Sequence, residues 1–307
     1  MTALRRALGE YLAVRRKCGF KLRRDGKLLP GFVRYLEQSG SPFITSSLAI
    51  AWATQPPTAQ PSWWISRLVA VRGFAKYLQA SDPRHDVPPL ELLPRREPRP
   101  VPYVYEPADI AALMGAAMTL RSPLMAATYN TLLGLLAVTG LRVGEALALD
   151  ECDVDLRQGV LLIRRAKFGK SREVLLHPTA IRALVRYARD RDRIAPRRRT
   201  AAFFVSTATT RLIYQNVHET FLRLVYAAGL ANRRPRRPTI HDLRHGFAIR
   251  TVLAWHRAGE DVEAKLPTLS TYLGHVGPSA TYWYLTAVPE LLGAATARLE
   301  RAWKARS

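Results

Sequence analysis

The chain has 307 residues, of which 47 are basic and 24 acidic, so its formal net charge is +23. Such an excess predicts a polyanionic partner bound in a salt-sensitive way, with a membrane surface as the alternative partner. A hydrophobic share of 48% is enough for packed cores and excludes a disordered basic tail, and the length is typical of two domains.

The cysteine pattern argues against metal and disulfide chemistry. Cys18 and Cys152 are the only cysteines, and they form neither a CxxC pair nor a cluster with histidine. We therefore expect no metal and no disulfide framework, with both thiols buried in a reducing compartment. The N-terminus lacks the apolar core of a secretory signal, and no apolar run approaches a membrane span of about 20 residues. These patterns predict a soluble, cytoplasmic protein.

Residues 1–94 are predicted to form a small bundle of four short helices. Apolar residues recur there at helical spacing, and Ser39-Gly40 and Pro56-Pro57 separate the stretches. Up to Gly40 there are ten basic residues against three acidic ones. We expect this imbalance to mark a DNA-binding face that includes Arg15, Arg16 and Lys17, with a solvated charged face as the alternative.

The stretch from Asp82 to Pro107 is dominated by proline and arginine, which predicts an extended and fairly stiff chain. Within it, residues 95–106 are predicted to be the linker between two domains. Such a linker could pass around a DNA duplex with its arginines on the phosphates, or could be a plain spacer.

Residues 107–307 are predicted to be mostly helical, with one small β-hairpin. Helices are expected from Pro107, over 125–138, over 178–194 and over 214–228; β-type runs are 160–165, 172–176 and 202–205. Lys167 and Lys170 lie at or near the tip of the hairpin formed by the first two β-type runs. There they could reach a substrate or be solvated loop lysines.

A glycine-rich turn follows the helix over 125–138. Gly140 can end that helix and let the backbone turn, so that Arg142 emerges at the start of the next one. Glu145 lies three residues further on, on the same helical face as Arg142. In isolation this pattern equally describes a surface ion pair of little energetic weight.

A second basic cluster combines a loop with the start of a helix. His241 and Arg244 are three residues apart, so on a helix both side chains project from one face and can address a single anion. The preceding loop carries four arginines that would strengthen the positive field, Arg233, Arg234, Arg236 and Arg237. In so basic a chain the expected anion is a nucleic-acid phosphate. The phenol of Tyr284 adds a nucleophile that could form a covalent phosphotyrosine.

In order along the chain, five pieces resemble the conserved pattern of the tyrosine recombinases, also called phage-type integrases. They are Thr139-Gly140-Leu141-Arg142-Val143-Gly144-Glu145, the hairpin Lys167, His241-x-x-Arg244, Leu273-Gly274-His275 and Tyr284. The resemblance spans the C-terminal region, and the N-terminal bundle resembles the core-binding, SAM-like domain of that family. It therefore implies a mainly α-helical fold whose catalytic domain occupies residues 107–307.

The resemblance also implies roles at a scissile DNA phosphate. Arg142 and Arg244 would clamp its non-bridging oxygens and stabilise the charge of the transition state. Tyr284 would attack phosphorus and leave a 3′-phosphotyrosine and a free 5′-hydroxyl. His241 would accept the phenolic proton, and Lys167 would protonate the leaving oxygen.

Three further residues are implied at the site, His275 as a catalytic residue and Glu145 and His245 as supporting ones. His275 would hydrogen-bond the phosphate and Glu145 would position its neighbours. His245 is either a member of the site or a histidine that packs the helix.

Two assignments rest on spacing within the resemblance. Tyr284 lies nine residues after His275, as the family pattern requires, whereas Tyr282 would face the other side of a helix. Lys167 begins a K-x-x-K-x-R stretch that ends at Arg172, and Lys170 is the alternative to it. The separation of 34 residues between His241 and His275 is longer than in compact members of the family, which leaves the local helix geometry open.

The expected function is site-specific recombination of DNA, without metal, ATP or other cofactor. The expected partner is double-stranded DNA with inverted-repeat-type sites, bound by a dimer per site and a homotetramer per synapse, at the nucleoid. A terminal helix from about Pro289 would dock on the neighbouring protomer. The alternatives are a type IB topoisomerase-like relaxase and a catalytically silent DNA-binding regulator.

Overall fold

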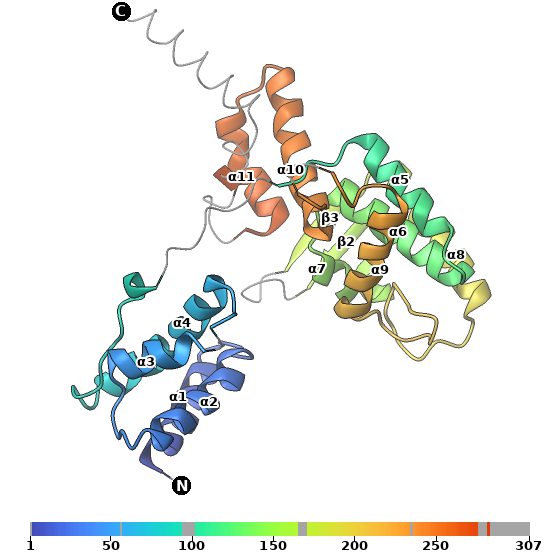
Figure 1. Cartoon of the computed structure of the whole chain (residues 1–307). Helices are drawn as coiled ribbons and strands as arrows, with labels where there is room; N and C mark the ends of the chain where they lie inside the picture. Colours follow the sequence, from blue (N-terminus) through green and yellow to red (C-terminus); the bar gives the residue numbers. More distant parts are fainter. Residues whose placement is uncertain are drawn as a thin grey trace, which may run out of the picture. The chain divides into compact units, whose positions relative to one another are not determined.

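The computed structural model describes residues 2–55, 57–93, 102–164, 171–233, 236–275 and 281–282. The chain divides into two compact units, 1–100 and 101–307. Among the described residues helices predominate, and a small antiparallel sheet is confined to the second unit (Figure 1). The mainly α-helical fold expected from the sequence is confirmed.

The first unit is a helical bundle. Its elements are α1 (Ala3–Lys17), α2 (Asp25–Gln38), α3 (Ser46–Ala53), α4 (Pro61–Gln79) and the short 3-10 helix η1 (Leu90–Leu92). Their apolar faces bury Leu29, Phe32 and Phe74 almost completely. Thr45 caps α3 by accepting a hydrogen bond from the backbone N–H of Leu48 at 3.3 Å. The helix periodicity of the sequence therefore yields one compact core.

The first unit extends through the first part of the proline-rich stretch. His85 is buried, and its Nδ1 accepts a hydrogen bond from the backbone N–H of Ile44 at 3.1 Å. Leu93 is buried in the same core. On the other side of the stretch, Tyr103 and Tyr105 are buried in the core of the second unit. The second unit is therefore already packed at Tyr103, within the span 95–106 expected as linker, of which 95–101 lies outside the described residues.

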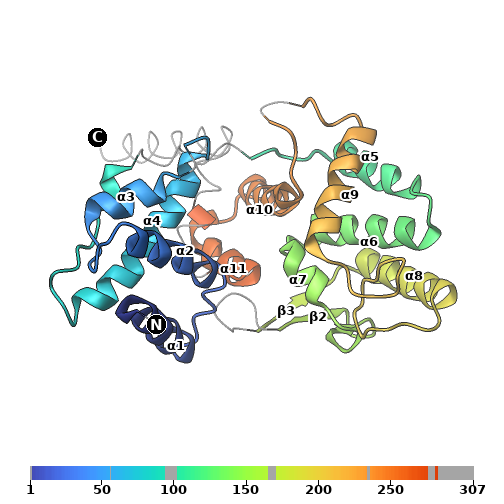
Figure 2. The same ribbon diagram turned by 60° about the horizontal axis from the view of Figure 1, so that its bottom comes forward.

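The second unit is built around one central helix. Its helices are α5 (Pro107–Met118), α6 (Pro123–Thr139), α7 (Val143–Ala148), η2 (Glu151–Asp153), α8 (Pro178–Ile194), α9 (Tyr214–Ala227), α10 (Ile240–Arg257) and α11 (Val262–Leu273). Helix α6 packs against α5, α8 and α10, and α11 packs against α10 (Figures 1 and 2). The sheet has the order β1 (Val154–Asp155), β2 (Val160–Ile163) and β3 (Arg172–Leu175).

Two expectations from the sequence are wrong. Cys18 and Cys152 are exposed rather than buried, and Arg164 approaches the sulfur of Cys152 at 3.6 Å. The apolar run 202–205 forms two isolated bridges, one at each end, instead of a strand. Because all four of its side chains are buried, packing rather than a β-ladder accounts for their apolar character.

Candidate active site

The turn after α6 delivers Arg142 to its position. Helix α6 ends at Gly140, whose φ of +62° lies in the left-handed region that favours glycine. A Cβ at Gly140 would lie 2.5 Å from Cδ1 of Phe247, so the turn also packs closely against α10. Arg142 is then the N-cap residue of α7, as the sequence predicted. Arg142 pairs with Glu145, as in the alternative interpretation of this pattern, with an Nη1 to Oε1 distance of 2.9 Å.

Glu145 is a buried carboxylate that is shared by two arginines. Its side chain is 9% exposed, and it accepts from Arg142 and also from Arg172 of β3. Burial opposes ionisation, but the hydrogen bonds and charges of Arg172 and Arg142 outweigh it, so the pKa of Glu145 lies below its usual value. The carboxylate therefore remains charged at neutral pH and fixes both guanidiniums.

The start of α10 is fixed by Asp242, which is fully buried. Asp242 accepts from the backbone N–H and the hydroxyl of Thr239 at 2.8 and 2.7 Å and completes a capping box. Its other oxygen accepts from Arg236 at 2.6 Å. This arrangement fixes the direction in which the first turn of α10 presents His241 and Arg244.

Two histidines of α10, His241 and His245, lie together on its first two turns. The rings of His241 and His245 meet edge to face with centroids 4.5 Å apart. His241 is exposed, whereas His245 is buried. The exposed imidazole of His241 is therefore the one that solvent or a substrate can reach.

Arg142 and Arg244 converge on one point at the end of α11. Arg244 is 2% exposed and donates from Nη1 to the carbonyl of Gly140 at 2.8 Å and from Nη2 to that of Leu273 at 2.7 Å. Arg142 donates from Nη1 to the same Leu273 carbonyl at 3.4 Å and from Nη2 to that of Gly274 at 3.1 Å. Two guanidiniums separated by 102 positions in the chain thus share an acceptor.

His275 follows this convergence directly. Gly274 ends α11 with a φ of +65°, and the backbone N–H of His275 closes the turn on the carbonyl of Ser270 at 2.9 Å. Nδ1 of His275 lies 2.7 Å from the hydroxyl of Thr281, which is fully buried. The main chain that carries this imidazole therefore directly follows the Gly274 carbonyl that accepts from Arg142.

The remaining candidates fall into four groups. Lys167, Lys170, Arg234 and Tyr284 lie outside the described residues. Arg233 and Arg237 are exposed, whereas Arg236 is engaged with Asp242. In the first unit Arg16 and Lys17 are exposed at the end of α1, and Arg15 stacks on the ring of Phe20 at 3.7 Å. Tyr282, the alternative nucleophile, is 46% exposed.

The sequence interpretation gave no role to two residues that the structure places at this site. Arg172 joins Glu145 to the end of α11, and Thr281 contacts His275. Arg172 closes the K-x-x-K-x-R stretch, so its place in that motif was a visible signal. Thr281 carried no such signal, because no short sequence pattern predicts its contact with His275.

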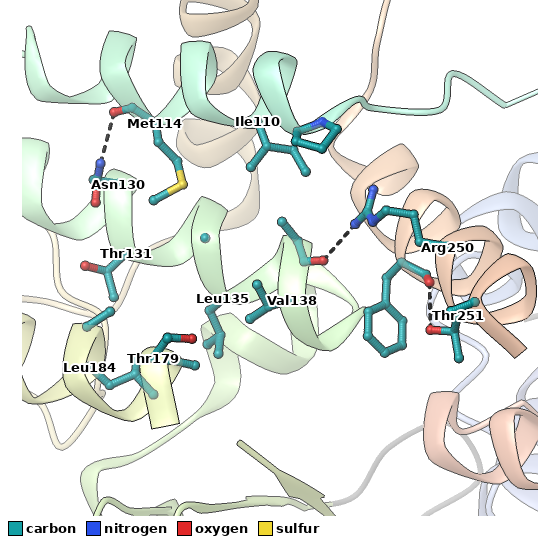
Figure 3. A pocket seen from close by; sticks show the side chains of 17 residues that line it. Ile110, Met114, Asn130, Thr131, Leu135, Val138, Thr179, Leu184, Arg250 and Thr251 are labelled. Atoms are coloured by element: carbon teal, nitrogen blue, oxygen red, sulfur yellow. Dashed lines mark hydrogen bonds between the residues drawn. The ribbon is translucent and has the colours of Figure 1, made fainter. Parts of the chain in front are cut away.

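A separate apolar pocket of about 630 Å³ lies between α5, α6, α8 and α10 (Figure 3). Its walls include Ile110, Met114, Leu135 and Val138, and Arg250 donates to the carbonyl of Ala137 at its edge. None of the charged residues that converge at the end of α11 lines it. The candidate active site is therefore the arginine pair and not this pocket.

Within the described ranges, no group of three or more His, Cys, Asp or Glu side chains could hold a metal ion. Among those same residues, no helix is long and apolar enough to cross a membrane. The described site presents guanidiniums and imidazoles, which are groups that bind an anion with two acceptor oxygens.

The chain is similar to known proteins both in sequence and in structure. The model of the phage integrase family matches residues 104–290. A putative integrase/recombinase of Sinorhizobium fredii, y4rB, is 44% identical over 100% of both chains. The tyrosine recombinase XerD of Xanthomonas campestris pv. campestris is 32% identical over 76% of this chain and 70% of its own.

Among solved structures, the Tn1549 transposon integrase in complex with transposon right end DNA matches with a TM-score of 0.70. The match covers 95% of this chain and 98% of that chain at 18% identity. The XerH site-specific recombinase bound to a palindromic difH substrate matches with a TM-score of 0.63, covering 84% and 73% at 20% identity. These two likenesses are likenesses of fold.

Proposed function

Because the chain belongs to the phage integrase family, the tyrosine recombinases, we propose that it breaks and rejoins DNA strands through a covalent bond between Tyr284 and a DNA phosphate. In family and fold the chain is a site-specific recombinase. The observation that carries the proposed mechanism is the convergence of Arg142 and Arg244 on the carbonyl of Leu273, next to His275.

In the proposed first step, Arg142 and Arg244 bind the two non-bridging oxygens of the scissile phosphate. Two cationic donors at one point stabilise the additional negative charge of the pentacoordinate transition state. A carbonyl oxygen already accepts from both guanidiniums, which supports a site where a phosphate oxygen can do the same. Glu145 keeps Arg142 in place by accepting from its backbone and its side chain.

The hydroxyl oxygen of Tyr284 then forms a bond to phosphorus, and the bond to the 5′-oxygen of the next nucleotide breaks. His241 takes the phenolic proton, and Lys167 gives a proton to the leaving 5′-oxygen, each assistance being worth about 10² to 10⁴ in rate. His275 donates a hydrogen bond to the phosphate. Because the phosphodiester is replaced by a phosphotyrosine ester, the 5′-hydroxyl of another strand can reverse the step without ATP or metal.

We further propose a division of the DNA contacts. Arg233 and Arg237 are exposed in the loop before α10 and would neutralise phosphates beside the scissile one, whereas Arg236 serves mainly to hold Asp242. Arg234 belongs to the same loop, and we assign it the same phosphate-neutralising role as Arg233 and Arg237. Arg15, Arg16 and Lys17 of the first unit would contact the backbone of the same duplex at the nucleoid.

The proposed assembly is a dimer on each inverted-repeat site and a tetramer on two sites. An isologous pair of protomers matches the two-fold symmetry of an inverted repeat, so each protomer addresses one half-site. Light scattering of the protein on one-site and two-site duplexes measures this directly. A 1:1 complex on a complete inverted repeat would contradict it.

The mechanism is tested by trapping the covalent adduct on a fragment library of host DNA. Wild-type protein should give adducts that resist denaturation and map to one sequence. Tyr284→Phe should give none while binding the same sequence, and Tyr282→Phe should give adducts as the wild type does. The opposite pattern would assign the nucleophile to Tyr282. Relaxation of a supercoiled plasmid that lacks the mapped sequence would instead indicate a topoisomerase-like enzyme. If the wild-type protein forms no adducts, the chain is a catalytically silent DNA-binding protein.

A further inference from the structure

Arg172 lies at the start of β3 and joins two distant parts of the second unit. Its side chain is 12% exposed. Nη1 donates to Oε1 of Glu145 at 3.1 Å, Nη2 donates to Oε2 at 2.8 Å, and Nε donates to the carbonyl of Tyr272 at 2.8 Å. One guanidinium thus holds a carboxylate of α7 in a bidentate pair and the end of α11 at the same time.

Arg172 completes a set of three arginines, which we call the arginine collar: Arg142, Arg172 and Arg244. Their guanidiniums take the carbonyls of Tyr272, Leu273 and Gly274. These carbonyls belong to the C-terminal end of α11, where the helix dipole concentrates partial negative charge. The collar therefore fixes the helix end from which His275 emerges.

The members of the collar differ in what else they bind. Arg172 directs Nε, Nη1 and Nη2 to protein acceptors, and two of these acceptors are the carboxylate oxygens of Glu145, so it is placed to act on other residues rather than on DNA. Glu145 connects Arg172 to Arg142, because each of its carboxylate oxygens accepts a hydrogen bond from both arginines. At Gly274 a Cβ would lie 2.8 Å from Nη1 of Arg172, so glycine also makes room for this guanidinium.

We propose that Arg172 is a positioning residue for DNA cleavage, a role that rests on the proposed function. It sets the distance between Arg142 and His275 by tying Glu145 and the end of α11 to one rigid group. It also begins β3, so it ties that strand to the same point. Lysine cannot replace it, because a single ammonium lacks the planar fork that holds a carboxylate and a carbonyl together.

The test compares two DNA substrates that share the sequence mapped with the wild-type adduct. One carries the ordinary scissile phosphate, and the other a methylphosphonate that has no negative charge at that position. A defect that arises from a displaced arginine clamp should matter less on the uncharged substrate, because there is less charge for the clamp to stabilise. A defect that arises from misfolding or weak DNA binding should be the same on both.

For Arg172→Ala and Arg172→Lys we expect single-turnover cleavage of the phosphate to fall about 100-fold, the loss typical of a displacement of about 1 Å at a reacting centre. DNA affinity should stay within about twofold, and the loss on the methylphosphonate should be below about tenfold. Arg164→Ala is the matched control, since Arg164 flanks the same hairpin and pairs with Asp153 instead; its rates should equal those of the wild type.

Three results would overturn the inference. Cleavage of the phosphate by both Arg172 variants within threefold of the wild type would show that no positioning is needed. Equal losses on the two substrates would leave Arg172 a merely structural residue. Because the two substrates are compared within one protein preparation, a partly folded variant does not mimic the expected difference. Wild-type protein without adducts would overturn the proposed function itself, and this role with it.

Discussion

Replacing Glu145 by glutamine probes the collar without DNA. Glutamine has the shape of glutamate but no charge, so Arg142 and Arg172 would lose a shared, largely buried counterion. Removing one partner of a buried ion pair costs about 3 to 5 kcal/mol, and the amide retains one acceptor oxygen, so we expect a loss of about 2 to 3 kcal/mol in the free energy of unfolding. For a unit of about 200 residues this lowers Tm by about 4 to 12 °C.

The loss of stability in Glu145→Gln is expected to depend on pH. The pKa of Glu145 is lowered in the folded protein, so its stabilising contribution is fully present above the unfolded-state pKa of about 4.3 and is lost as pH falls through the folded-state pKa. Glutamine does not titrate. The difference between wild type and Glu145→Gln should therefore be largest near pH 7 and should shrink below about pH 4.

Urea denaturation and scanning calorimetry from pH 7.5 to pH 3.5 measure this difference. Glu173→Gln is the matched control, because Glu173 is the exposed neighbour of Arg172 on β3; it should change the free energy of unfolding by less than about 0.5 kcal/mol. Two results would contradict the claim that Glu145 is ionised and shared by the two arginines. One is a loss in the free energy of unfolding for Glu145→Gln no larger than that of the control, and the other is a difference from the wild type that stays constant with pH.

Three further predictions use other parts of the site. Gly140→Ala should destabilise the second unit by about 2 to 4 kcal/mol, because it combines a positive φ with a Cβ in contact with α10, whereas Gly115→Ala, in open space on α5, should be neutral or stabilising in the same calorimetry. Lys167→Ala should lose cleavage of ordinary DNA and recover it when sulfur replaces the 5′-bridging oxygen, and Lys170→Ala should not need that rescue; absence of recovery would remove the proposed role of Lys167. Deletion of the residues after Ala287 should leave DNA binding intact and abolish the tetramer on two-site DNA, and an unchanged tetramer yield in light scattering would disprove this.

Local structure was predictable where a short pattern determines it. The bounds of α8 agree with the prediction, since Pro178 suits the first turn and the apolar positions recur at helical spacing from there. The left-handed end of α6 at Gly140 and the pairing of Arg142 with Glu145 also follow from residues close together in the chain. The strand β1 was missed because two residues give no periodicity.

The rest of the site depends on contacts that a linear pattern does not carry. Arg172 meets Glu145 across 27 positions and the carbonyl of Tyr272 across 100 positions. Every residue type carries the same main-chain oxygen, so the sequence does not show which carbonyls accept hydrogen bonds. The contacts between the collar and the end of α11 could therefore not be predicted. The exposure of Cys152 was also mispredicted. Cysteine is usually buried, but Cys152 lies in the short 3-10 helix η2 and is exposed there.

The three guanidiniums of the collar reach α11 through main-chain oxygens, and this has a consequence for how such proteins can diverge. Side chains along the solvent side of α11 can drift without weakening the attachment, because every residue type supplies the same oxygen. The number of residues in α11 cannot change without weakening the attachment. One inserted residue turns the end of the helix by about 100° and moves all three acceptors away from their donors. Relatives of this chain should therefore vary in the composition of α11 while conserving its length.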